Sequence, residues 1–167
     1  AGQGRWPAKL ELNFSKQLGR TTLLCKHYGP LRVQKALYPE GEDCCHAVII
    51  HPPGGIAAGD DLSIDINCQE EASALVTTPG AAKWYGAYGG GHATQRIALS
   101  VKGALEWFPQ ETIIFNHANV ESSITIRLED QATMIGWDTL IFGRSACNES
   151  FKAGRFVQQL QLNVGKQ

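Results

Sequence analysis

The sequence predicts an all-β fold with little helix, and three observations carry this prediction. Apolar and polar residues alternate with a period of two over residues 62–67, 97–102 and 124–129, a pattern that is typical of half-buried strands. Each of these runs is followed by a polar turn, a small residue and a second apolar run. Few segments show the apolar periodicity of an α-helix. We therefore expect pairs of strands, joined by turns, along most of the chain.

The strand pairs recur at an interval of about 30 residues. Aligning Ala74 with Ala104 gives an offset of 30, and aligning Leu105 with Met134 gives an offset of 29. A repeat of this length predicts stacked β-layers in which each layer buries its face on the next. The expected architecture is an elongated, layered, β-helix-like stack of sheet; a β-sandwich with similar strand spacing is the alternative.

The sequence predicts the other elements less clearly. A strand-like run covers residues 45–50, and residues 78–85 suit either a short helix or a turn. The glycine-rich stretch Gly86–Gly91 suggests a mobile loop. An alternating strand over residues 156–164 leaves a sheet edge that needs cover, which hints at missing sequence or at a partner.

Length and composition favour one globular domain over residues 1–167. A hydrophobic fraction of 43% argues against wholesale disorder. The net charge of -1 offers nucleic acid or anionic lipid no bulk attraction, and no apolar run reaches membrane-spanning length. Five cysteines without regular spacing are expected to be reduced thiols in a cytoplasmic protein.

The loop between His51 and Asp60 is the most informative segment. Two prolines followed by two glycines end the preceding strand and force a shaped loop, and its glycines permit positive φ and close backbone approach. The simplest interpretation is a turn in which Asp60 or Asp61 caps backbone N–H groups. The residues that shape the loop are Pro52, Pro53, Gly54, Gly55 and Gly59.

Known catalytic motifs are missing from the sequence. It contains no GxxxxGK[ST], HExxH or GxSxG, and no CxxC pair of the kind that holds structural zinc. Cys44, Cys45 and His46 form the densest group of soft ligands, and in a strand Cys44 and His46 share one face. They suit transient binding of nickel, copper or zinc; alternatively, Cys45 is a core residue and His46 a surface residue.

Four acidic residues are candidate functional residues, because three of them lie in or beside apolar strand-like runs. Buried carboxylates are costly unless they are paired, hydrogen-bonded or metal-bound. If the repeats stack, Glu106 and Asp138 are expected to share a column, which would form a hydrophilic path for cations; separate surface acids are the alternative. The four acids are Asp60, Glu106, Glu111 and Asp138.

Ordered motifs of the chain resemble those of the urease accessory protein UreD (UreH) family from Trp6 to about Gly154. No single motif would suffice, but their order and spacing together are specific. The matching segments are Gly29–Gln34, Tyr38–Gly41, His51–Gly55 with Gly59 and Asp60, Thr77–Lys83, Leu105–Glu111, Gly136–Trp137 and Gly143–Arg144.

The resemblance implies a non-enzymatic scaffold for urease maturation with a layered β fold. It implies as partners apo-urease and UreF, and through UreF the nickel-carrying GTPase UreG. It also implies an internal path for nickel, with Asp60, Glu106, Glu111 and Asp138 as its expected acids. No cofactor is expected to be tightly bound. Transient binding of Ni²⁺ is expected.

Other functions stay open. A plain assembly adaptor without a nickel path would rely on surface aromatics, for which Trp84, Tyr85 and Tyr88 are the expected anchors. A small metal-dependent hydrolase would use His51, Asp60 and the nearby acids. The family is considerably longer at its C-terminus, so the chain is expected to lack that part.

Overall fold

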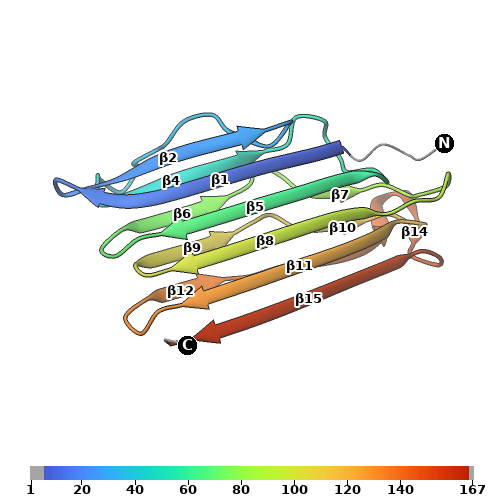
Figure 1. Cartoon of the computed structure of the whole chain (residues 1–167). Helices are drawn as coiled ribbons and strands as arrows, with labels where there is room; N and C mark the ends of the chain where they lie inside the picture. The colour runs from blue at the N-terminus through green and yellow to red at the C-terminus, as the bar shows by residue number, and fades with distance from the viewer. Residues whose placement is uncertain (1–5, 166–167) are drawn as a thin grey trace.

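The computed structural model describes residues 6–165, which form three sheets with one short 3₁₀ turn at Ser145–Cys147 (Figure 1). The largest sheet has six strands in the order β15-β11-β8-β5-β1-β2. Its strands are β1 (Trp6–Gln17), β2 (Arg20–Tyr28), β5 (Asp60–Cys68), β8 (Ala93–Val101), β11 (Asn119–Leu128) and β15 (Arg155–Val164).

Two smaller sheets complete the stack. The five-stranded sheet, in the order β12-β9-β6-β4-β3, contains β3 (Arg32–Val33), β4 (Cys44–Ile50), β6 (Ser73–Thr77), β9 (Ala104–Phe108) and β12 (Thr133–Gly136). The four-stranded sheet, in the order β14-β13-β10-β7, contains β7 (Ala82–Trp84), β10 (Thr112–Ile114), β13 (Leu140–Arg144) and β14 (Glu149–Ser150).

Successive turns of the chain stack on one another in parallel. The chain passes through β5, β6 and β7, then β8, β9 and β10, then β11, β12 and β13, and equivalent strands pair in parallel. Figure 1 shows the long strands of the six-stranded sheet side by side in front of the shorter strands. The all-β prediction is confirmed, and the parallel stacking is that of a β-helix rather than of an antiparallel sandwich.

The core lies between the two larger sheets. Alternate residues of β1 and β5 point into it, as do Cys45, Ala47 and Ile49 of β4, all of which are buried. A period of two is what strand geometry dictates for a sheet with one buried face. The largest fully buried side chains include Trp84, Phe14, Leu10, Leu12, Ile66, Leu99 and Leu105.

The repeat offset predicted for the first pair of coils is wrong by one residue. Ala74 pairs with Leu105, an offset of 31, whereas the offset of 29 between Leu105 and Met134 is confirmed. The turns differ in length, since four residues separate β5 from β6 and two separate β8 from β9. A slip of one residue exchanges the two faces of a strand, so Glu106 lies beside Leu75 on the outward face.

The segment at residues 78–85, expected as a helix or a turn, contains a strand. Lys83 of β7 pairs with Ile113 of β10, and the Trp84 side chain is buried beneath. The stretch Gly86–Gly91 lies outside the strands as a loop; its mobility stays a prediction. The last strand, β15, lies at the edge of its sheet, as expected. Within residues 6–165, no helix is long and apolar enough to cross a membrane.

Candidate functional site

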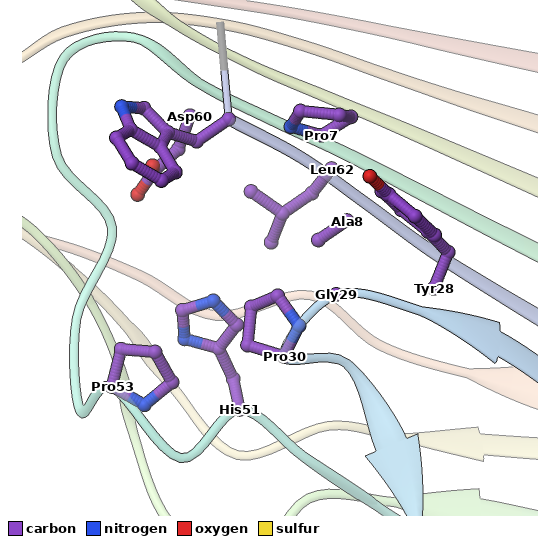
Figure 2. A pocket seen from close by; sticks show the side chains of 10 residues that line it. Pro7, Ala8, Tyr28, Gly29, Pro30, His51, Pro53, Asp60 and Leu62 are labelled. Carbon is purple, nitrogen blue, oxygen red and sulfur yellow. The ribbon is translucent and has the colours of Figure 1, made fainter.

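A pocket of about 490 Å³ opens where the start of β1 meets the loop that follows β4 (Figure 2). His51 and Pro53 come from this loop, and Asp60 is the first residue of β5. Figure 2 shows the His51 ring directed into the pocket from the side opposite Leu62 and Asp60. The other lining residues are Trp6, Pro7, Ala8, Tyr28, Gly29 and Pro30.

Backbone pairing places Asp60 at this opening. Trp6 pairs with Asp60 in the parallel β1–β5 ladder, and the Trp6 N–H donates to the Gly59 carbonyl at 3.0 Å. Asp60 also closes a turn, because its Oδ2 accepts the Ala57 N–H at 2.9 Å. The simplest interpretation of the loop, with Asp60 as a capping acid, is therefore confirmed, and the same carboxylate lines the pocket.

The glycines of the loop have separate physical roles. Gly54 has a φ of +75°, in the left-handed region that favours glycine, and its N–H donates to the His51 carbonyl at 3.2 Å. Gly55 lies under the ring of Tyr85, where an added Cβ would approach Tyr85 Cε2 to 2.2 Å. The loop therefore follows a path that these residue types permit.

The loop is attached to the four-stranded sheet at Ile56. The Ile56 N–H donates to the Lys83 carbonyl at 2.7 Å, and the Tyr85 N–H donates to the Ile56 carbonyl at 2.8 Å. Ile56 thereby forms an isolated parallel bridge with Trp84. These bonds fix the loop on the same coil that carries the Thr77–Lys83 motif.

Burial lowers the pKa of His51, and the neighbouring charge of Asp60 opposes that shift. Removing an imidazolium from water disfavours its charged form, which explains the direction. A histidine with a lowered pKa is neutral near pH 7, so one ring nitrogen carries a free lone pair. His51 and Asp60 thus offer one nitrogen ligand and one carboxylate at the same pocket.

A second, more apolar pocket of about 220 Å³ adjoins the first and shares His51 and Leu62 with it. Its walls include Ile64 and Gln95 from the six-stranded sheet. They also include residues 78–83, which follow β6 and lead into β7. Two segments of the sequence that carry the family resemblance, around His51 and around Pro79, therefore meet in space.

The four predicted acids are not gathered in one pocket. Asp60 lines the pocket of Figure 2, whereas Asp138 is exposed and lines a separate groove beside Trp137. Glu106 is on the outward face of β9, and Glu111 directly precedes β10.

The prediction that Glu106 and Asp138 share a column is wrong. Glu106 pairs with Leu75 and Ile135, and Asp138 lies beyond the end of β12. The offset of 29 between these coils puts Ile135 opposite Glu106 and leaves Asp138 three residues further along the chain.

The expected aromatic anchors divide into two kinds. Trp84 is only 1% exposed, so its expected place at a surface interface is wrong: it packs in the core behind the bridge to Ile56. Tyr85 and Tyr88 remain accessible, at 39% and 77% exposure. Tyr85 is steadied by an edge-to-face contact with Phe115, with ring centroids 5.1 Å apart.

One group of three metal-ligating side chains occurs within residues 6–165, and it lies outside both pockets. It consists of Glu40, Cys44 and His46, whose ligand atoms lie within 4.8 Å of one another. The sequence points to Cys44 and His46 because both occur on one strand face. It gives no signal for Glu40, since a turn brings that residue into place.

Comparison with known proteins gives consistent matches. A family model described as UreD urease accessory protein matches residues 7–167. The chain is 49% identical over 160 residues to a urease accessory protein UreD of Methylobacillus flagellatus, which covers 95% of the chain and 56% of that relative. The chain is similarly 50% identical over 161 residues to a protein of the same name from Dechloromonas aromatica, covering 95% and 56%.

A protein of the same name from Ralstonia nicotianae is 49% identical over 160 residues, covering 94% of the chain and 54% of that relative. The chain therefore spans about half the length of the curated relatives it matches.

Proposed function

Because the chain belongs to the UreD family of urease accessory proteins, we propose that it takes part in urease maturation as a non-enzymatic scaffold. In this proposal it binds apo-urease and UreF, and through UreF the GTPase UreG. The observation that carries the proposal is the family match over residues 7–167, which includes both segments that meet at His51. A protein of this kind needs extended surfaces more than a closed catalytic centre.

The scaffold would also assist nickel delivery, with Ni²⁺ as cargo. His51 and Asp60 offer imidazole and carboxylate donors at a solvent-open pocket, and imidazole in particular suits nickel. Two donors bind a divalent ion weakly, which suits a residue pair that must pass the ion on. In this proposal Glu106, Glu111 and Asp138 provide further carboxylates along the route, and no metal stays tightly bound to these acids.

A plain assembly adaptor is the second candidate, and one observation favours it. The four acids are distributed over separate surfaces and pockets rather than along one cavity. An adaptor would need the exposed Tyr85 and Tyr88 more than these carboxylates. The two candidates differ in what they require: nickel loading depends on the acids in the first and not in the second.

The experiment that tests the scaffold is a pull-down of this chain with UreF and apo-urease, followed by nickel activation of the captured urease. Capture with activation is the expected result, and it would show that residues 1–167 suffice for both steps. Capture without activation would support the adaptor for this chain. If a folded chain captures neither partner, the scaffold proposal is wrong for residues 1–167.

A further inference from the structure

A short hairpin folds back over the start of β4 and carries Glu40 to it. Leu37 and His46 exchange backbone hydrogen bonds of 3.0 and 2.8 Å, which close the hairpin. At its tip the Gly41 N–H donates to the Tyr38 carbonyl at 3.3 Å, and Gly41 has a φ of +102°. The backbone thereby reverses, so Glu40 lies against the outward face of β4, which carries Cys44 and His46.

The three side chains offer one donor atom each, and these atoms lie within 4.8 Å of one another. Donors around a tetrahedral ion with the usual bond lengths lie roughly 3.3–3.8 Å apart. Small rotations of the three side chains are therefore enough to bring the donors around one ion. Cys44 and His46 are half-buried, whereas Glu40 is exposed, which leaves one side of the group open to solvent.

The His46 ring nitrogen at this group lacks a hydrogen-bond partner. Within the described part of the chain, His46 Nε2 is buried and no donor or acceptor satisfies it. Glu40 Oε1 lies 3.6 Å from it, which is longer than a hydrogen bond and is an ion pair only when His46 is protonated. A buried polar atom of this kind is costly and calls for an explanation.

We propose that Glu40, Cys44 and His46 form a binding site for a borderline divalent metal ion of the Ni²⁺ and Zn²⁺ class, with the fourth position open to water. The His46 Nε2 atom then gains its missing partner in the ion. A thiolate, an imidazole and a carboxylate select such ions, because Mg²⁺ and Ca²⁺ prefer sites made of oxygen alone. Three protein ligands with one open position are typical of sites that exchange their ligands.

The site is held in place by Thr21 of β2. Buried Thr21 donates from Oγ1 to the Asp43 carbonyl at 2.6 Å and accepts the Ser73 N–H at 3.2 Å. The Thr21 N–H also donates to the Glu42 carbonyl at 2.9 Å. The residues just before Cys44 are therefore fixed to β2, which Thr21 in turn joins to β6, and little backbone ordering remains to oppose metal binding.

The Tyr38 side of the hairpin is anchored as well. The Tyr38 hydroxyl donates to the Thr21 carbonyl at 2.9 Å, and the Arg20 guanidinium lies 4.3 Å from the centre of the Tyr38 ring. Arg20 in addition pairs with Glu42 at 3.3 Å. Both ends of the segment that carries Glu40 are thus attached to β2 or β4.

Charge around the site favours a cation. Burial raises the pKa of the Cys44 thiol, the Ser73 side chain lowers it, and the carboxylates of Glu40 and Glu106 raise it. Glu106 occupies the row that runs from His46 through Leu75 across the sheet. A thiol binds a metal ion as thiolate, so its proton is released to solvent as the metal–sulfur bond forms.

The titratable groups around Cys44 are Glu40, His46, Cys45, Cys68 and Glu106. Cys45 and Cys68 are buried in the core, so neither thiol is accessible to an ion at this site. The inference does not depend on urease maturation, since it concerns the chain and a metal ion alone.

The test is an anaerobic titration of the chain with Ni²⁺. The titration is monitored by calorimetry and by the thiolate-to-nickel charge-transfer absorption in the near ultraviolet. We expect one ion per chain and a charge-transfer band that grows with added Ni²⁺ until one ion per chain is bound. Zn²⁺ should displace nickel and erase the band, whereas Mg²⁺ should not compete. Binding with no charge-transfer band would overturn the proposal, because it would exclude the Cys44 thiolate as a ligand.

Single substitutions assign the band to these residues. Cys44→Ser should abolish the band, and His46→Gln and Glu40→Gln should each weaken nickel binding about tenfold or more. Cys25→Ser and Cys147→Ser are the matched controls, and both should keep band and affinity. Circular dichroism would establish that each variant is folded. A band that survives Cys44→Ser, or one that disappears in Cys147→Ser, would place the bound ion elsewhere and refute the site.

Discussion

The ring of Tyr85 lies directly over the Cα of Gly55, so that a Cβ at Gly55 would stand 2.2 Å from Tyr85 Cε2 and 2.5 Å from its hydroxyl oxygen. The contact joins the loop after β4 to the residue that follows β7. It explains why glycine is favoured at the second glycine position of the loop although the φ of Gly55 is ordinary. The relationship also yields a direct test of the loop structure.

Gly55→Ala should displace the Tyr85 ring and lower the free energy of unfolding by about 1 kcal/mol, since the ring is partly exposed and can turn away. In the Tyr85→Ala background the same substitution should cost almost nothing. Urea denaturation of the four proteins in this double-mutant cycle measures the coupling. Equal costs in both backgrounds would show that the contact does not constrain the loop.

Gly29→Ala should be more damaging, because the obstacle is backbone. Gly29 has a φ of +74°, and an added Cβ would lie 2.8 Å from the Pro7 carbonyl oxygen at the pocket wall. Gly19 is the matched control: its φ is +81°, with nothing within 4 Å of an added Cβ. We expect Gly29→Ala to cost about 2 kcal/mol more than Gly19→Ala. Similar denaturation midpoints for both variants would contradict the close approach.

Thr21→Val should lower the free energy of unfolding by about 1–3 kcal/mol, because it leaves the Asp43 carbonyl and the Ser73 N–H without their buried partner. Valine has nearly the same shape, so the loss reports the hydrogen bonds. Thr22→Val is the control, since Thr22 is less buried and its hydroxyl bonds to Ser15. A Thr21→Val cost no larger than that of the control would argue against this anchor.

Asp60→Asn separates the charge of Asp60 from its structural role. Asparagine keeps an oxygen that can accept the Ala57 N–H, so stability and complex formation should be retained while nickel loading of urease falls. Asp60→Ala should lower nickel loading too, and should in addition cost about 1 kcal/mol of stability. Glu106→Gln should likewise lower loading without loss of the complex. Metal content of the captured urease is the measurement.

Glu70→Gln controls for the general loss of a negative charge, because Glu70 is exposed in the turn after β5. It should leave loading unchanged. Normal loading in both Asp60→Asn and Glu106→Gln would remove these residues from the nickel route and favour the adaptor.

His51 should make the protein less stable at acidic pH. Its folded pKa lies below the ordinary value of 6.5, so between the two values the unfolded chain binds more protons than the folded chain. The contribution of His51 to the free energy of unfolding is then fully present above pH 6.5. It is lost as the pH falls through the folded pKa. The effect is small because His51 is only half-buried.

The measurement is the difference in urea midpoint between the wild-type chain and His51→Gln from pH 7 to pH 5. The wild-type midpoint should fall more steeply on acidification. Parallel profiles for the two proteins would show that burial does not hold His51 in its neutral form.

Much of the fold was predictable because strand patterning is local. The alternation at Leu62, Ile64 and Ile66 follows directly from a sheet with one buried face, and the structure has these residues in the core. The loop from His51 to Asp60 was also predictable, since proline and glycine restrict or free the backbone wherever they occur. The family resemblance rested on the same local motifs, and the family match confirms it.

Several features could not be predicted because they depend on how distant segments meet. Within residues 78–85, Ala82–Trp84 became a strand because β10 pairs with it and the Trp84 side chain is buried. The same burial removed Trp84 from the expected surface anchors.

By itself, the sequence determined the strands, the shaped loop and the family, because each depends on residue type and short spacing. The tertiary structure decided which residues face one another. Turn lengths set the register between coils and placed Glu106 beside Leu75, and a hairpin brought Glu40 to Cys44 and His46. The physical reason is that a side chain's neighbours in a stacked sheet belong to other coils, whose alignment depends on every turn between them.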